Sequence, residues 1–206
     1  MNLLSIFQQR HSIRKYTGAP IDDAALTQII QAGLLSASSR SIRPWEFIVV
    51  KDKDMLRHLS ECRTGAAWML AGADAAIVVI ANAEVSDVWI EDSSIAMANM
   101  HLMADSLGIG SCWIQGRLRT ATSTDSGTAS ITTEDYVREC LHFPEGYKLE
   151  AILSLGMPAE EKTPAELSKL PFEKIHYEKF SSTRYREILK SFIVCGICPQ
   201  PDFTNT

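Results

Sequence analysis

The chain has 206 residues, of which 46% are hydrophobic and 22% charged, with a net charge of -5. This profile favours a single globular domain and excludes a strongly basic protein of the nucleic-acid-binding type. The five cysteines are scattered, which predicts no disulfide framework, and the N-terminus soon turns polar, which predicts no signal peptide. Apolar runs are shorter than the roughly 18 residues that a membrane span needs. We therefore predict a cytoplasmic protein without a membrane span or a nucleic-acid partner.

The first half of the chain alternates between helical and extended patterns. Apolar spacing predicts a short opening helix, and Asp22 is the expected cap of the next one. The run AAIVVIA has no polar alternation and predicts a strand buried on both faces. In chain order we predict a helix at 2–9, a loop at 10–20, a helix from 22 to about 36, a loop at 37–45, a strand at 46–50, a helix at 54–61 and a strand at 75–81.

The second half holds the most regular predicted helix, at 91–107, where Ile95, Ala98, Leu102 and Met103 form one apolar stripe. Helices alternating with few strands fit a sheet covered by helices on both faces, and periodicity leaves the strand pairing open. We further predict a strand at 111–114, an excursion rich in Ser, Thr and Gly at 119–131, a capping box opening a helix from 132 to 141, a strand at 151–155, an irregular segment from 156 and a closing helix at about 183–193.

The first chemical motif is RHSIR, at residues 10–14. Two arginines and a hydroxyl lie within five residues, directly after a predicted helix. Guanidinium groups suit phosphate because their planar fork makes charge-assisted, often bidentate hydrogen bonds. The alternative is a solvated basic turn, which the pentapeptide alone does not exclude.

Two further motifs flank predicted strands. SSRSIRPWEF, from Ser38, carries hydroxyls and backbone groups suited to lining a heteroaromatic ligand; alternatively it is a plain helix-to-strand connection with Trp45 in the core. LGIGSCWIQG, from Leu107, places glycines around a short strand, so that backbone can approach a ligand closely. Its spacing is not that of a dinucleotide-binding fingerprint. A fourth stretch, LGMP from Leu155, ends a strand sharply.

Together these stretches resemble the FMN-dependent nitroreductase family. The resemblance runs from about Leu3 to Phe180 and rests on RHSIRKY, SSRSIRPWEFIVV, EDSSIAMANMHLMADSLGIGSCWI and AILSLGMPAEE with its trailing EKIHYEKF. It implies an α+β fold, a three-layer sandwich whose central mixed, mostly antiparallel sheet is flanked by helices. It also implies one FMN-binding domain at residues 1–190, a tail at 191–206, and a homodimer with FMN at its interface.

The resemblance assigns roles to the N-terminal motif. It implies that Arg10 contacts the FMN phosphate and that His11 and Ser12 help to hold the phosphate and ribityl chain. Arg14 is expected beside the pyrimidine edge of the flavin ring. Because reduction places negative charge near flavin N1 and O2, a cation there stabilises the reduced form. Arg14 is therefore the predicted catalytic residue.

The remaining implied contacts come from three separate segments. The loop before Pro44 is expected from the partner subunit. Members of the family often have Asn and Gln where this chain has Ser41 and Arg43, which leaves the amide contacts open and Arg43 either at the substrate or solvated. A backbone N–H beside the ring is expected to face flavin N5. The implied cofactor contacts are Ser38, Ser39 and Arg40 from the loop, Trp113, Gln115 and Gly116 beside the ring, and Lys169, with Lys162 as a rival, at the phosphate.

The implied reaction takes hydride from NADH or NADPH and reduces nitroaromatics, quinones or similar conjugated electrophiles by a ping-pong mechanism. Two alternatives stay open. One keeps the fold and cofactor but changes the reaction, to reductive dehalogenation, flavin breakdown or oxidation of a peptide-derived ring. The other is a flavin-binding protein without enzymatic activity.

Several other residues receive structural interpretations. Cys195 and Cys198 form an isolated CxxC outside the matched region, and no histidine lies at a metal-binding spacing. We expect His101 near the polar edge of its helix. That helix is apolar beyond one stripe, which suits burial against a second subunit. Residues interpreted as packing groups are Met97, Met100, Met103, Cys112 and Cys140.

Overall fold

The computed structural model describes residues 2–121 and 131–180. The chain divides into two compact units, residues 1–163 and 164–206. Most of the predicted excursion at 119–131 lies outside the described residues. The closing helix at 183–193, the tail and the Cys195/Cys198 pair also lie outside them.

The first unit is built on a four-stranded sheet with the order β1-β2-β4-β3. All three strand pairs are antiparallel, and parallel pairing in the described residues is confined to a single bridge between Ser12 and Ser111. The predicted strands are confirmed, although the last one begins earlier than expected. Their bounds are β1 Trp45–Val50, β2 Ala75–Asn82, β3 Gly110–Gln115 and β4 Tyr147–Gly156.

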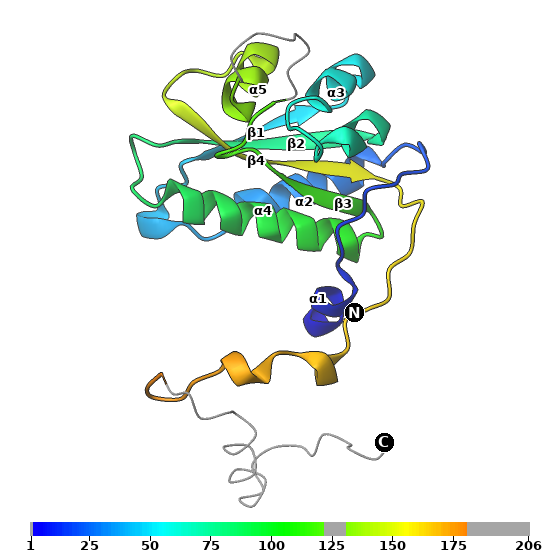
Figure 1. The fold of residues 1–206 in the computed structure, drawn as a ribbon, viewed down its shortest axis with the longest axis vertical. Coiled ribbons are helices and arrows are strands. Elements are labelled where there is room, and N and C mark those ends of the chain that lie inside the picture. Colours follow the sequence, from blue (N-terminus) through cyan, green and yellow to red (C-terminus); the bar gives the residue numbers. More distant parts are fainter. Residues whose placement is uncertain (1, 122–130, 181–206) are drawn as a thin grey trace, which may run out of the picture. The chain divides into compact units, whose positions relative to one another are not determined.

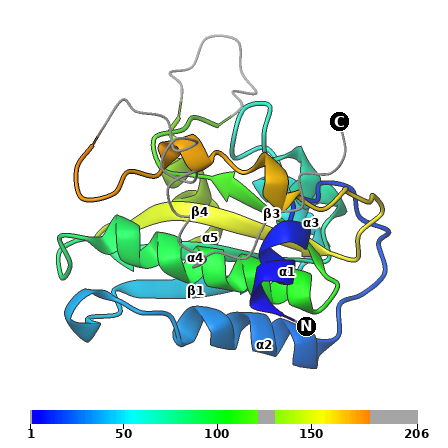
Figure 2. The ribbon, with the colours of Figure 1, turned by 90° about the horizontal axis from the view of Figure 1, so that it is seen from below.

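Helices cover both faces of this sheet, so the predicted three-layer α+β architecture is confirmed (Figure 1). On one face α2 (Asp23–Leu34) and α4 (Trp89–Ser106) lie side by side, as Figure 2 shows. On the other face lie α3 (Lys53–Leu59) and α5 (Thr133–Leu141). The short α1 (Leu3–Gln9) contacts α4. No helix among the described residues has both the length and the apolar character to cross a membrane.

Of the two caps that the sequence predicts, Thr132 is confirmed and Asp22 is confirmed only in position. The Thr132 hydroxyl accepts the N–H of Asp135 at 3.0 Å, as a capping box requires. The Asn2 side chain caps α1 by accepting the N–H of Leu4 at 3.1 Å. Asp22 holds the cap position of α2, but its carboxylate makes no hydrogen bond to that helix.

Each face of the sheet has its own apolar core. The core beneath α3 and α5 includes Leu56, Leu59, Cys112, Val137 and Ile152. The core beneath α2 and α4 includes Ile29, Ile77, Met97, Met100 and Leu153. Strands β2 and β4 contribute to both cores, which explains the apolar run from Ala75 to Ala81 in β2 and the burial of β4 from Leu149 to Gly156, polar Glu150 and Ser154 included.

The face that α4 turns to the sheet differs from the predicted stripe. Ile95 is 42% exposed and Ala98 is also exposed, whereas Ala96, Met97 and Met100 are fully buried. Met97 and Met100 are thus in the core and Met103 packs against it, but Ile95 and Ala98 of the predicted stripe point outward. The reason is that α4 is apolar around much of its circumference, so hydropathy alone selects no single face.

The second unit is described only over residues 164–180. It contains two single-turn helices, Leu167–Lys169 and Phe172–Lys174. None of these residues is buried. Large apolar side chains remain exposed along the segment, at Leu167, Leu170, Phe172, Ile175, Tyr177 and Phe180.

Candidate functional site

The segment that follows α1 runs across one end of the sheet. The N–H of Ile13 donates to the carbonyl of Ser111 on β3 at 2.9 Å. The N–H of Thr17 donates to the carbonyl of Met157, just after β4, also at 2.9 Å. The RHSIR motif is therefore tied to the two strands whose ends carry the glycine-containing motifs.

Two glycines permit this close crossing. A Cβ at Gly110 would lie 2.7 Å from the Ile13 side chain, and a Cβ at Gly156 would lie 2.6 Å from the Tyr16 ring. Neither distance is compatible with an ordinary side chain at those positions. Gly110, for which the sequence predicts close approach of backbone to a ligand, and Gly156 both admit the chain's own N-terminal segment.

Tyr16 fixes the far end of the crossing. Its hydroxyl donates to the carbonyl of Ile13 at 2.9 Å and shares a 2.7 Å hydrogen bond with the Ser154 hydroxyl on β4. Burial raises the pKa of Tyr16, so its hydroxyl stays protonated at neutral pH. The turn between Arg10 and Tyr16 is therefore anchored at both ends.

Arg10 lies at the start of the turn, beside the C-terminal half of α4. Its Nη1 donates a 2.9 Å hydrogen bond to Nε2 of His101. Within the described part of the chain, no carboxylate lies within ion-pair distance of Arg10. The neighbouring His11 donates from Nδ1 to the carbonyl of Gln9 at 2.6 Å. Arg10 thus presents a positive charge that forms no ion pair with a carboxylate of the described residues.

We expected His101 near the polar edge of its helix, and this prediction is wrong. The residue is buried, with 6% of its surface exposed. Its Nδ1 lies 2.5 Å from the Ser111 hydroxyl. Burial, followed by the positive charge of Arg10, lowers the pKa of His101 to about 4. A signal was present in the sequence: His101 is four residues after Met97 and three before Ala104, which places all three on one face of α4.

Arg14 lies at the outer side of the same turn, and its side chain is exposed. Its backbone N–H donates to Glu160 Oε1 at 2.7 Å, and Lys162 Nζ lies 2.8 Å from Glu160 Oε2. These bonds lower the pKa of Glu160 to about 2, and the hydrogen bond from the Arg14 N–H has the largest effect. Lys162, the rival phosphate ligand, is therefore paired with a carboxylate that anchors the turn.

The end of β3 presents the second predicted group of residues. Trp113 Nε1 donates to Gln115 Oε1 at 2.9 Å, and Gln115 Nε2 lies 3.4 Å from the carbonyl of Glu150. The same carbonyl accepts the N–H of Gly116 at 3.1 Å. The N–H of Gly116 is thus bonded within the sheet, and a ring-facing N–H elsewhere in this segment stays a prediction. A cavity of about 580 Å³ opens beside Gly116 and Arg117.

The loop with Ser38, Ser39 and Arg40 lies at the other end of α4. The N–H of Ser39 donates to Asp92 at 2.8 Å, and Arg40 pairs with Asp87. His101 follows Asp92 by nine residues, which along a helix amounts to about 13 Å. One copy of the chain therefore does not bring this loop to Arg10.

Backbone strain is concentrated in this loop. Arg40, Ser41 and Arg43 have φ values of 53°, 55° and 52°, in the left-handed region that residues other than glycine seldom adopt. Such conformations cost on the order of 1–3 kcal/mol each and cluster at functional sites. Trp45 behind the loop is a core residue, 5% exposed, as the alternative interpretation expects, and the role of the loop at a ligand stays a prediction.

A model of the nitroreductase family matches residues 7–67 and 56–157. The chain belongs to the nitroreductase family. It is 36% identical to a protein of Archaeoglobus fulgidus with the provisional name NADH dehydrogenase/NAD(P)H nitroreductase, over 86% of this chain and 98% of that protein. It is 44% identical to an FMN-dependent nitroreductase from Clostridium difficile of known structure, with a TM-score of 0.80 and coverage of 86% of this chain and 99% of that one.

A more distant structure shares the nitroreductase fold alone. This NADPH:FMN oxidoreductase of Vibrio harveyi, complexed with NAD+, is 22% identical, with a TM-score of 0.72 and coverage of 95% of this chain and 85% of that one. Its likeness therefore supports the architecture of the first unit and carries no residue roles to this chain.

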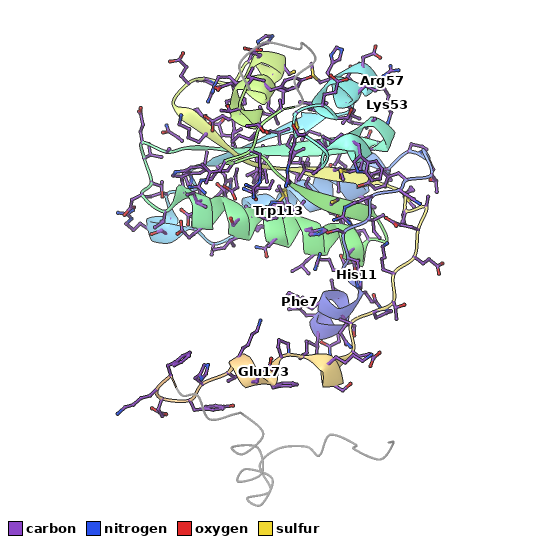
Figure 3. All side chains as sticks on the ribbon, viewed as in Figure 1. Phe7, His11, Lys53, Arg57, Trp113 and Glu173 are labelled. Carbon is purple, nitrogen blue, oxygen red and sulfur yellow. The ribbon has the colours of Figure 1, made fainter. Side chains whose placement is uncertain are left out.

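In this nitroreductase-family chain the predicted residues fall into separate groups. One turn, beside the start of β3 and the end of β4, carries Arg10, His11, Ser12 and Arg14. Figure 3 shows His11 there, away from Lys53 and Arg57 on α3. Ser38–Arg40 lie at the opposite end of α4. Lys169 belongs to the second unit, where its Nζ pairs with Glu166 at 2.8 Å. Its phosphate contact stays a prediction.

Proposed function

We propose that this chain binds FMN as a homodimer and uses it to transfer electrons from NADH or NADPH to nitroaromatics, quinones or similar conjugated electrophiles. The observation that carries the proposal is the Arg10–Arg14 turn. It presents two cations at the glycine-bearing ends of β3 and β4, and Arg10 has no carboxylate partner in the described part of the chain. The names of relatives from Archaeoglobus and Clostridium agree with this function.

The donor set of the turn fits a phosphate. One N–H of Arg10 is bonded to His101, which leaves the rest of its guanidinium fork to bind oxygen. Ser12, in the same turn, adds a hydroxyl and itself forms the backbone bridge with Ser111. We assign Arg10, with His11 and Ser12, to the FMN phosphate and the adjoining ribityl chain.

Arg14 is the residue we assign to tuning of the reaction. Bound FMN would supply the two-electron chemistry that no side chain of the protein offers. Because its backbone is anchored by Glu160, the exposed Arg14 side chain extends from a fixed point. A cation held there would stabilise negative charge on a reduced ring.

A second copy of the chain would complete the site. In the single chain, Leu3, Leu4 and Phe7 of α1 and Ile95 of α4 remain exposed. The apolar segment at 164–180 has no buried residue of its own. We propose that the partner covers these surfaces and supplies Ser38, Ser39 and Arg40, which lie too far along α4 from Arg10 to act within one copy.

We further propose that the electron donor and the electron acceptor bind one after the other at the same site, which would give ping-pong kinetics. The cavity beside Gly116, lined also by Trp89, Arg117 and Arg119, is where we place it. The free thiols of Cys62 and Cys112 fit a reducing, cytoplasmic setting.

A spectrum of the purified protein followed by anaerobic titration tests the proposal. We expect flavin absorbance, bleaching by NADH or NADPH, and recovery with a quinone or nitroarene. Bleaching by dithionite alone would indicate a flavin-binding protein without this activity, and reduction without turnover of those acceptors would indicate a different reaction. A colourless protein that takes up no added FMN would overturn the assignment.

Arg10→Ala should weaken FMN binding at moderate salt, whereas Arg57→Ala should not. Arg57 is a suitable control because it is an exposed arginine on α3, at the opposite face of the sheet. Equal FMN affinity in the two variants would remove the phosphate role of Arg10.

A further inference from the structure

His101 is one of three polar residues that α4 buries, the other two being Asp92 and Ser93 near its start. The helix otherwise turns mainly small and apolar side chains toward the sheet, among them Ala96, Met97, Met100 and Ala104. Both ring nitrogens of His101 have partners, Arg10 on one side and Ser111 on the other. A buried polar group bonded at both ends links the RHSIR motif to β3.

The chemistry of the two partners determines the state of the imidazole. Because a guanidinium group only donates hydrogen bonds, Nε2 of His101 must accept from Arg10 and carry no proton. The low pKa of His101, caused mainly by burial, keeps the ring neutral at pH 7. The single ring proton is therefore on Nδ1, which donates to the Ser111 hydroxyl.

We propose that His101 is a positioning residue that holds the Arg10 guanidinium ready for the FMN phosphate without neutralising its charge. The inference rests on the proposed function, since it takes Arg10 as the phosphate ligand. The geometry is a chain of two hydrogen bonds, 2.9 Å from Arg10 to His101 and 2.5 Å from His101 to Ser111. Through it, β3 fixes one N–H of Arg10.

A neutral acceptor is the appropriate partner for this task. A carboxylate in the place of His101 would form an ion pair with Arg10 and compete with the incoming phosphate. Asp105, one turn further along α4, is close enough to feel the charge of Arg10 and His11, but no ion pair joins it to Arg10 and burial raises its pKa. His101 therefore orients the cation while its charge remains available to an anion.

Two substitutions of His101 test the hydrogen bonds of its two ring nitrogens separately. His101→Gln places an amide oxygen near the position of Nε2, so it can still accept from Arg10. His101→Asn places an amide N–H near the position of Nδ1, so it can keep the Ser111 contact but not the Arg10 contact. We expect FMN affinity within about threefold of the wild type for Gln and at least about tenfold lower for Asn.

The double variant Arg10→Ala/His101→Asn distinguishes positioning from general damage. If His101 acts through Arg10, adding His101→Asn to Arg10→Ala lowers FMN affinity no further. Equal losses in the Gln and Asn variants, or additive losses in the double variant, would overturn the inference. Unchanged affinity in Arg10→Ala alone would instead overturn the phosphate role of Arg10 under the proposed function.

A measurement on the unmodified protein keeps the inference testable if a variant does not fold. A long-range proton–nitrogen NMR spectrum at pH 7 should show His101 as a neutral ring protonated on Nδ1, with or without FMN. A ring protonated on Nε2, or a charged ring, contradicts the hydrogen bond from Arg10 and the positioning role with it.

Discussion

Glu160 Oε1 accepts the backbone N–H of Arg14 at 2.7 Å, although the two residues are 146 positions apart in the chain. The same oxygen lies 3.3 Å from the N–H of Lys15. The carboxylate thus binds two successive backbone donors of the turn and joins the segment after β4 to the RHSIR motif. It holds the main chain of Arg14 while leaving the guanidinium exposed.

Removal of this carboxylate should displace Arg14 without touching the flavin site directly. We expect Glu160→Ala to lower the reduction potential of bound flavin and slow its reduction by NAD(P)H, and Glu160→Gln to retain much of both, because an amide oxygen still accepts the two N–H groups. Potentiometric titration and stopped-flow reduction measure these effects. Glu161→Ala, an exposed neighbour, is the control; a shift of equal size there would contradict the role of Glu160.

The same carboxylate makes a pH prediction. Since the pKa of Glu160 is lowered to about 2 in the folded protein, mainly by the hydrogen bond from Arg14, its contribution to stability is present above its unfolded value, 4.5. It is lost as the pH falls toward about 2. Wild type should therefore lose more stability than Glu160→Gln between pH 5 and the acid limit of the assay, measured by urea unfolding. Parallel curves would contradict this assignment.

The crossing of the N-terminal segment over the sheet predicts sharply different costs for three glycine substitutions. Gly156→Ala and Gly110→Ala should each destabilise the protein by about 1–3 kcal/mol, because the new methyl groups would meet Tyr16 and Ile13. Gly72→Ala, where no atom lies within 4 Å of the added Cβ, should have little effect. Thermal unfolding measures all three, and similar losses at all three positions would show that the crossing is not tight.

His101 predicts a loss of stability in mild acid. Its pKa falls from 6.5 to about 4 on folding, mainly through burial, so between these values the unfolded chain binds a proton that the folded chain does not. The free energy of unfolding should therefore decrease by up to about 3 kcal/mol as the pH falls through this range. His101→Gln should flatten the slope, whereas a substitution of His58, exposed on α3, should not. Urea unfolding at constant excess FMN provides the measurement.

The outward face of α4 predicts dependence on a second copy. If the proposed dimer buries Ile95, Ile95→Asp should convert it to monomer and reduce FMN retention, because a charged side chain would then need to be buried at an apolar interface. Trp68→Asp is the matched control, since Trp68 is 53% exposed in the short helix Trp68–Gly72, which packs against α3. Sedimentation velocity gives the oligomeric state. A monomeric wild type that binds FMN fully would contradict this prediction.

Much of the fold was readable from local patterns. Strand β2 is a continuous apolar run from Ala75 to Ala81, as expected of a strand buried on both faces, and Thr132 begins α5 as its capping box predicts. The glycines of the LGIG motif predict that backbone can approach a ligand closely; in the structure Gly110 lies against Ile13, and Gly156 of the LGMP motif lies against Tyr16. Periodicity left the strand pairing open because pairing depends on contacts between distant segments.

By itself the sequence determined most of the helices and strands that the structure describes, which family the chain resembles and which turn carries two closely spaced arginines. These properties follow from side-chain periodicity, capping and the type of residue at each position, all of which act over a few neighbours. Only the tertiary structure decided that His101 is buried between Arg10 and Ser111, that Ile95 faces outward, and that Ser39 and Arg10 lie at opposite ends of α4. The physical reason is that a helix apolar around most of its surface has no preferred face until the strands and loops packed against it select one.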